Sequence, residues 1–150
     1  MRVLLQRVSQ AKVEVDGRLI GQISQGLLLL LGIEEADTEE DIEWLVRKAA
    51  RMRLFADAQG KMNASLHEVQ GQALIVSQFT LHASTKKGHR PSFLRAAAPA
   101  QALPLYHQFL KTWEKETGRA PASGQFGAAM EVSLVNDGPV TIWIDSKARE

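Results

Sequence analysis

Apolar residues follow one another without alternation at two places, residues 27–33 and residues 73–76. Such runs are typical of strands that are buried on both faces. Asp16 and Gly17 form a good hairpin turn between two further strands. The other predicted strands are shorter or carry one polar face. They cover residues 1–8, 11–16, 19–24, 61–66, 130–135 and 140–144.

Two segments have the spacing of apolar residues that a helix requires. The first follows an acidic stretch, where Asp37 or Thr38 can cap a helix with Glu40 or Asp41 three residues later. Its apolar face is formed by Ile42, Leu45, Val46, Ala49 and Leu54. The second covers about residues 100–117 and ends at Gly118. Pro104 marks either the start of this helix or a kink in its first turn.

This order of about seven strands and two helices predicts an α+β fold. We expect a strongly curved, partly barrel-like sheet with the two helices packed on its outside. Residues 119–127 are rich in Gly, Ala, Ser and Pro, which predicts a loop. The length of 150 residues fits one domain. We expect residues 146–150 to form a flexible, dispensable tail.

The composition of the chain excludes several classes of function. The chain has no cysteine, which removes disulfides and thiolate chemistry, and its formal net charge is only +1. The first eight residues do not resemble a signal peptide, and the longest apolar run, residues 27–31, is too short to span a bilayer. We therefore expect a cytoplasmic protein with neither a membrane nor DNA as a partner. The four histidines lack metal-ligand spacing, so we expect no metal and no cofactor.

Polar residues interrupt the end of the buried stretch 73–81. Ser77, Gln78 and Thr80 stand there among large hydrophobic residues, and buried polar groups need hydrogen-bond partners. Their clustering predicts a polar pocket that opens from the core. The following segment carries five cationic or imidazole side chains, which favour an anionic substrate: Lys86, Lys87, His89, Arg90 and Arg95.

Side-chain catalysis has weak support in the sequence. Ser77 could act as a nucleophile with His82 as its base, but no third group orients them. The string 136–139, Asn-Asp-Gly-Pro, is typical of a hairpin turn between two strands. A Gly-Pro bond can also be cis at low cost, which would aim consecutive carbonyls in one direction. Spacing alone does not choose between these two interpretations.

Two separated motifs, Ser77-Gln78-Phe79-Thr80-Leu81 and Asn136-Asp137-Gly138-Pro139-Val140-Thr141, resemble the signature pair of the D-aminoacyl-tRNA deacylases. The resemblance extends over essentially the whole chain, at residues 6–8, 60–63, 90–93 and 124–130. It implies hydrolysis of the ester between a D-amino acid, or glycine, and the terminal adenosine of tRNA, including glycyl-tRNA mischarged on tRNA-Ala. This activity would serve chiral proofreading in translation.

The resemblance also implies a homodimer, in which a cis Gly-Pro turn of one subunit enters the pocket of the other. The carbonyls of Gly138 and Pro139 would then hold the substrate α-amino group and leave no room for an L side chain. Arg7 would brace this turn. Without the family, Arg7 is an ordinary cation on a strand surface.

For catalysis, the resemblance implies backbone donors near Phe79 and Thr80, in a pocket shaped by Ser77 and Gln78. Either the Thr80 hydroxyl attacks, or water attacks with help from the substrate's 2′-hydroxyl, and we favour the second because Thr80 has no evident base. The rest of the tRNA end would be bound by two groups of residues. Phe126 and Met130 would bracket the adenosine, and Lys86, Lys87 and Arg90 would contact phosphates.

Two other functions are compatible with these residues. A non-catalytic tRNA-binding module would explain the basic segment and the absence of familiar side-chain machinery. A general esterase would depend on the hydroxyl of Ser77 or Thr80.

Overall fold

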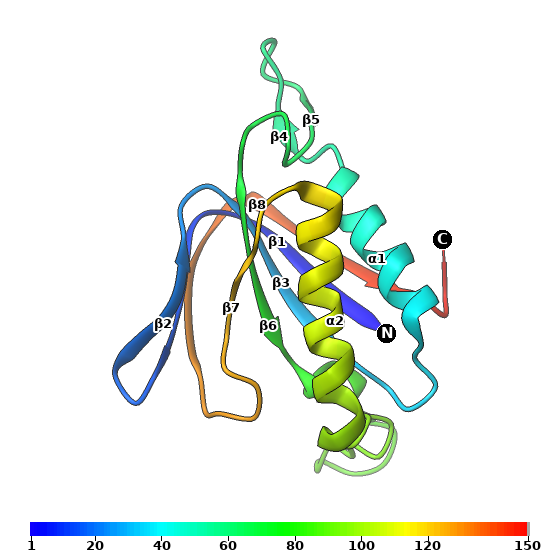
Figure 1. The fold of residues 1–150 in the computed structure, drawn as a ribbon. Helices are drawn as coiled ribbons and strands as arrows, with labels where there is room; N and C mark the ends of the chain where they lie inside the picture. Colours follow the sequence, from blue (N-terminus) through cyan, green and yellow to red (C-terminus); the bar gives the residue numbers. More distant parts are fainter. Residues whose placement is uncertain (150) are drawn as a thin grey trace.

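The computed structural model describes residues 1–149, and its strands and helices are arranged as Figure 1 shows. A six-stranded sheet has the order β2-β1-β3-β6-β7, and β8 pairs with β1 as well. A separate two-stranded sheet joins β4 and β5. The elements are β1 (Arg2–Val15), β2 (Arg18–Ile23), β3 (Gly26–Gly32), α1 (Glu39–Arg51), β4 (Phe55–Ala56), β5 (Met62–Ala64), β6 (Gln72–Ser77), the 3-10 helix η1 (Phe79–His82), α2 (Pro99–Thr117), β7 (Ala122–Ser123) and β8 (Glu131–Asp145).

The sheet has an apolar layer on each face, as the unbroken run in β3 predicts. Leu27, Leu29 and Leu31 belong to the layer beneath the helices. Leu28, between them in sequence, belongs to the second layer, which the curled half of the sheet encloses. Because successive side chains of a strand point to opposite faces of the sheet, those of β3 reach both layers. The helices α1 and α2 lie side by side over one face (Figure 1), which confirms the predicted α+β architecture.

The first helix begins as its sequence indicates. Thr38 precedes α1, its backbone N–H donates to the Asp41 carboxylate at 2.9 Å, and the two residues form a capping box. The apolar face continues only to Ala50, because the helix ends at Arg51. Leu54 is buried but lies beyond the helix, which corrects its predicted place on the helical face.

The second helix includes Pro104 without ending there. It begins at Pro99, so Pro104 lies inside the helix and does not mark its start. Gly118 ends the helix with a φ of 71°, as predicted. Within residues 1–149, no helix is both long enough and apolar enough to cross a membrane.

Residues 1–8 and 11–16 form one continuous strand rather than the two that the pattern predicts. β1 pairs with β3 along residues 2–8 and with β2 along residues 11–15, and its pairing with β8 is irregular between Gln6 and Gln10. No strong turn former stands between Val8 and Ala11, so the strand bends and changes partner without a break. The hairpin at Asp16 and Gly17 follows as predicted.

The strand β8 is also continuous, from Glu131 to Asp145, where the pattern predicts two strands, 130–135 and 140–144, with a hairpin between them as the ordinary interpretation. The two halves of β8 do not pair with each other, since Val132 lies opposite Val13 and Ile142 lies opposite Leu5, both on β1. The pairing skips from Asn136 to Thr141, so residues 137–140 bulge out of the ladder. The string of turn formers therefore makes a protrusion on a long strand.

Two smaller predictions also change. The loop predicted at 119–127 contains β7, which pairs in parallel with β6. The expected tail at 146–150 begins with a buried Ser146, whose hydroxyl accepts a hydrogen bond from the Met1 amino group at 2.9 Å. Lys147 then pairs with Asp41 at 2.8 Å. Residues 146 and 147 thus contact the rest of the chain, and residue 150 lies outside the described residues.

Candidate active site

The polar motif 77–80 lies where β6 leaves the sheet. Ser77 is the last residue of the strand, opposite Leu31 of β3. The Gln78 N–H donates to the Leu31 carbonyl at 2.7 Å, and the chain then turns into η1. The first bond of this 3-10 helix runs from the Leu81 N–H to the Gln78 carbonyl at 3.2 Å. The strand end therefore becomes a tight, well-anchored turn.

This turn leaves two amide groups without a hydrogen-bond partner among the described residues. Within residues 1–149, the N–H groups of Phe79 and Thr80 donate no hydrogen bond, as expected for the first residues of a helix. The side chain of Gln78 donates to the Thr80 hydroxyl. This contact fixes the Thr80 side chain while both amides stay available. Such paired donors can stabilise a developing negative charge.

His82 is held behind the turn and does not serve Ser77. Its side chain is fully buried, and within residues 1–149 neither ring nitrogen forms a hydrogen bond. Its Nδ1 lies 3.9 Å from a Glu34 carboxylate oxygen. Burial lowers the pKa of His82, so the ring stays neutral at neutral pH. The arrangement therefore gives Ser77 no base, which weakens the esterase alternative.

The segment after β7 forms a wall beside β6. Phe126 packs against Tyr106, with ring centroids 5.8 Å apart, and the Tyr106 hydroxyl donates to the Ile75 carbonyl at 2.8 Å. Burial raises the pKa of Tyr106 to about 12, so this donor keeps its proton. Met130 lies against Gly124, where an added Cβ would be 2.6 Å from its sulfur. Phe126 and Met130 are both half-buried in this wall.

A second group of predicted residues gathers around the bulge of β8. The Arg7 Nε donates to the Asp137 carbonyl at 3.2 Å and lies 3.1 Å from the Asp137 carboxylate. Its guanidinium also donates to the Leu54 carbonyl. The Gly138–Pro139 bond is cis. At Gly138 the φ is 122°, and an added Cβ would lie 2.8 Å from the Arg7 Nη2, so only glycine fits against this guanidinium.

Asn136 has a role at the bulge that its sequence motif did not reveal. Its side-chain amide donates to the carbonyls of Arg7 and Val140, each at 3.0 Å. Asn136 is paired with Val8 at one end of the bulge, and its bond to Val140 reaches the other end. The two bonds therefore connect both ends of the bulge. The sequence motif indicates that Asn136 is a turn former. Only the pairing of β8 with β1 shows that its side chain connects the two ends of the bulge.

One chain does not bring these two groups together. Arg7 lies opposite Leu27 on β3, whereas Ser77 lies opposite Leu31. The groups are therefore separated by four residues along β3, about 13 Å at about 3.3 Å per residue, and by the width of β3 itself. The bulge and the turn at 77–80 are separate sites within a protomer.

The predicted phosphate contacts lie on an exposed loop. Lys86, Lys87 and Arg90 follow η1, and all three are exposed. None of them takes part in an ion pair within the described residues. Their charges are therefore available to an anion that approaches the end of β6.

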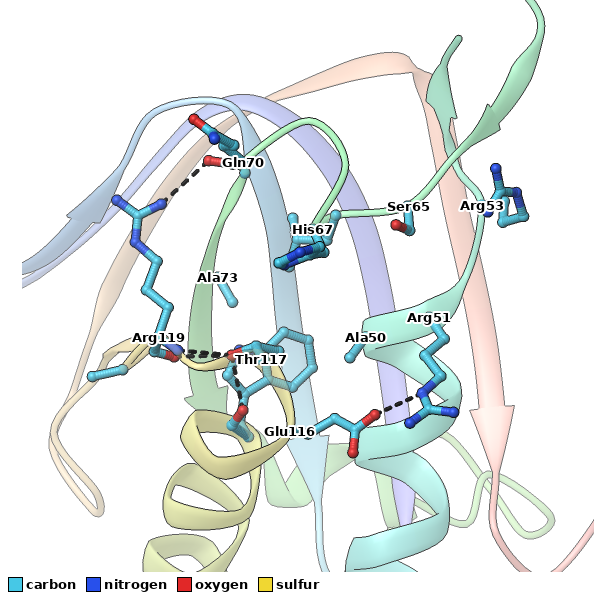
Figure 2. Close-up of a pocket in the computed structure, with 14 residues that line it drawn as sticks. Ala50, Arg51, Arg53, Ser65, His67, Gln70, Ala73, Glu116, Thr117 and Arg119 are labelled. Atoms are coloured by element: carbon cyan, nitrogen blue, oxygen red, sulfur yellow. Dashed lines mark hydrogen bonds and ion pairs between the residues drawn. The ribbon is translucent and has the colours of Figure 1, made fainter.

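A well-defined hollow lies elsewhere on the described part of the chain. It has a volume of about 700 Å³ and lies at the start of β6, where α1 and α2 end (Figure 2). Its rim includes Arg51, which pairs with Glu116 at 2.7 Å, and Arg119, which donates to the Gln70 carbonyl at 3.2 Å. These contacts tie the helix ends together. None of the predicted site residues lines this hollow.

Comparison with known proteins identifies the family. The family model described as D-Tyr-tRNA(Tyr) deacylase matches residues 4–145. The D-aminoacyl-tRNA deacylase of Akkermansia muciniphila is 59% identical over 150 residues, and that of Chromobacterium violaceum is 57% identical over 150 residues. Each match covers 100% of both chains.

Solved structures share the fold of this chain. A chain titled c-Myc DNA Unwinding Element Binding Protein superposes with a TM-score of 0.93 and 41% identity, over 99% of this chain and 100% of that one. A probable eukaryotic D-amino acid tRNA deacylase shares the fold, with a TM-score of 0.79 and 20% identity over 95% of this chain and 97% of that one. The chain therefore belongs to the D-Tyr-tRNA(Tyr) deacylase family.

Proposed function

We propose that this protein hydrolyses the ester bond of D-aminoacyl-tRNA, releases the free D-amino acid and tRNA, and thereby proofreads chirality in translation. Glycyl-tRNA mischarged on tRNA-Ala is a second substrate in this proposal. The observation that carries it is the pair of free amides at Phe79 and Thr80, in a chain whose relatives are named D-aminoacyl-tRNA deacylases.

The free amides stabilise the transition state. Water attacks the ester carbonyl carbon, a tetrahedral oxyanion forms, and the bond to the ribose oxygen breaks as that oxygen takes a proton. The N–H groups of Phe79 and Thr80 bind the oxyanion, and one such donor is worth on the order of 10² to 10³ in rate. Ser77 and Gln78 shape the pocket around the carbonyl.

The substrate's own 2′-hydroxyl assists the attacking water. Thr80 is a poor nucleophile here because its hydroxyl accepts a hydrogen bond from Gln78, and no basic side chain is bonded to it within residues 1–149. The buried His82 cannot supply that base. The ribose hydroxyl next to the ester is the nearest group that can move the proton.

A homodimer supplies the chirality filter. The bulge of one subunit, with the carbonyls of Gly138 and Pro139, enters the pocket of the other and holds the substrate α-amino group. This position leaves no space for an L side chain, and each tenfold in selectivity needs about 1.4 kcal/mol of difference. The separation of the bulge from the turn at 77–80 within one chain supports a filter that a second copy provides.

The remaining contacts hold the end of the tRNA. Phe126 and Met130 bracket the terminal adenine, because an aromatic ring and a thioether can pack on a base without reading its sequence. Lys86, Lys87 and Arg90 contact phosphates, and this part of the affinity falls as salt rises.

Matched D- and L-aminoacyl-tRNAs test the proposal. The same tRNA carries either enantiomer of one amino acid, and the ester that remains is followed over time. We expect release of the D-amino acid only, and loss of this release when Phe126 is replaced by Ala. The exposed Met62 on β5 provides a control variant, Met62→Ala, that should behave as the wild type.

Two outcomes would reject the proposal. Equal rates on both enantiomers would remove the chirality filter. Binding of charged tRNA without any turnover would favour the alternative, a non-catalytic tRNA-binding module.

A further inference from the structure

Two aromatic rings are exposed beside the turn at 77–80. Phe79 is 57% exposed and Phe93 is 38% exposed. Their ring centroids lie 5.2 Å apart, and the ring planes meet at 75°, an edge-to-face pair. In contrast, Phe55 and Phe109 are almost completely buried in the core. Large apolar side chains that cluster on a protein surface often mark a binding site, whereas single exposed apolar residues are normal.

The loop that carries Phe93 is fixed at both ends. Ser84 and Ser92 exchange two backbone hydrogen bonds, at 2.8 and 2.9 Å, which fold the loop back on itself. The Ala97 N–H then donates to the Ile33 carbonyl at 2.9 Å, next to β3. These bonds hold Phe93 against Phe79. The pair is therefore prepared before a ligand arrives, which lowers the entropy cost of binding.

The surroundings of the pair favour a polyanion. Lys86, Lys87, Arg90 and Arg95 lie on the same loop. From Val69 to Trp113 the sequence contains no Asp and no Glu. A ligand near the two rings thus meets the positive charge of this loop, and the carboxylate residue that the structure pairs with the loop is Glu34, opposite Ala96 at its far end. Exposed aromatic rings within a basic surface are typical of proteins that bind single-stranded nucleic acid.

The position of Phe79 limits which base can be bound. In the proposed function, the Phe79 backbone N–H donates to the oxyanion. The ring belongs to the same residue, so it lies close to the reacting ester. The terminal adenosine is already assigned to Phe126 and Met130. The rings of Phe79 and Phe93 are thus free for the neighbouring nucleotide, which is an unpaired cytidine because tRNA ends in the single-stranded sequence CCA.

We propose that Phe79 and Phe93 form a stacking site for the nucleobase that precedes the terminal adenosine of the tRNA. This inference rests on the proposed deacylase function and adds a second nucleotide site to it. The aromatic pair binds the base through its π-face, and the basic loop binds the phosphates on either side. The enzyme then recognises an unpaired 3′ end as well as the aminoacyl group.

Substrates of increasing length test this site. D-aminoacyl esters of adenosine, of the dinucleotide cytidylyl-adenosine and of tRNA are compared by KM. For the wild type we expect KM to fall by about tenfold from adenosine to the dinucleotide, within the range for stacking one base on an aromatic ring. Equal KM values for these two esters would overturn the proposal.

Variants of Phe93 separate stacking from general damage. Phe93→Ala should remove most of the tenfold difference between the two short esters, while Phe93→Tyr should keep it because the ring remains. If Phe93→Ala lowers kcat/KM by the same factor on all three esters, the ring acts on the fold of the turn and not on a second base. Failure of the proposed function has a different result: the wild type would hydrolyse none of the three esters.

Discussion

The Arg7 guanidinium lies between two backbone segments that are far apart in sequence, the Asp137 carbonyl at 3.2 Å on one side and the Leu54 carbonyl on the other. On β1, Arg7 lies opposite the bulge of β8 at residues 137–140, so its side chain holds this bulge in place. An ordinary surface cation would contact water and at most one carboxylate. The contacts of Arg7 are those of a structural brace.

Replacement of Arg7 by Met should loosen the bulge. The variant keeps an apolar stem but loses every donor to Asp137 and Leu54. We expect the ratio of D to L deacylation rates to fall by at least about tenfold, which corresponds to about 1.4 kcal/mol of lost discrimination. Lys12→Met is the matched control, since Lys12 is also a β1 cation but, among residues 1–149, pairs only with the nearby Glu14. An unchanged ratio in Arg7→Met would show that the bulge keeps its position without the guanidinium.

Substitution of Gly32 should disturb the turn at 77–80 from behind. A Cβ at this position would lie 2.9 Å from the Leu81 Cβ and 3.1 Å from the Gln78 carbonyl oxygen. The turn must therefore shift, and overpacking of this kind typically costs about 1–3 kcal/mol of stability. We expect Gly32→Ala to lower kcat by about tenfold with little change in KM, because the free amides move relative to the ester. Gly32→Ser should be worse than Gly32→Ala, and equal, near-wild-type kcat in both would contradict this account.

Loss of the Thr80 hydroxyl should have a small effect. The proposed donors are backbone amides, and the hydroxyl only accepts a hydrogen bond from Gln78. Thr80→Ala should therefore retain deacylation of D-aminoacyl-tRNA within about tenfold of the wild type. Removal of a true side-chain nucleophile costs on the order of 10⁶ in kcat. Single-turnover rates of wild type and variant, measured on the same charged tRNA, distinguish these two magnitudes.

His82 should make the unfolding free energy depend on pH in the mildly acidic range. Burial lowers the pKa of His82 in the folded protein below the ordinary value of about 6.5 that it regains on unfolding. Below about pH 6.5 the unfolded chain therefore binds a proton that the folded protein does not, and stability falls as pH falls. The slope from this one group is at most about 1.4 kcal/mol per pH unit.

Denaturant unfolding at several pH values measures this effect. His82→Leu should flatten the dependence below about pH 6.5. An identical slope in wild type and His82→Leu would mean that the proton is taken up elsewhere.

Local patterns in the sequence predict much of this fold because they depend on neighbouring residues only. The capping box at Thr38 and Asp41, the end of α2 at Gly118 and the buried run in β3 all follow from short-range chemistry. The polar strand end at Ser77 is also visible locally, because hydroxyl and amide groups stand out among apolar neighbours.

Long-range pairing is what the local pattern cannot supply. Residues 136–139 have the composition of a hairpin turn, and only the register of β8 along β1 makes them a bulge. In the same way, nothing near Arg7 in sequence indicates that Leu54 and Asp137 meet its guanidinium. The sequence motif marks these positions, whereas their geometry depends on strands more than one hundred residues apart.

The central strand β3 has a consequence for how the molecule opens. Its leucines reach both apolar layers, so neither layer can come apart while the other stays intact. Its backbone amides, paired on both edges with β1 and β6, should exchange with deuterium only when the whole chain unfolds. Lys86 lies on an exposed loop outside this sheet, so in the proposed function a tRNA end binds and leaves at that loop without opening the frame that holds the turn at 77–80.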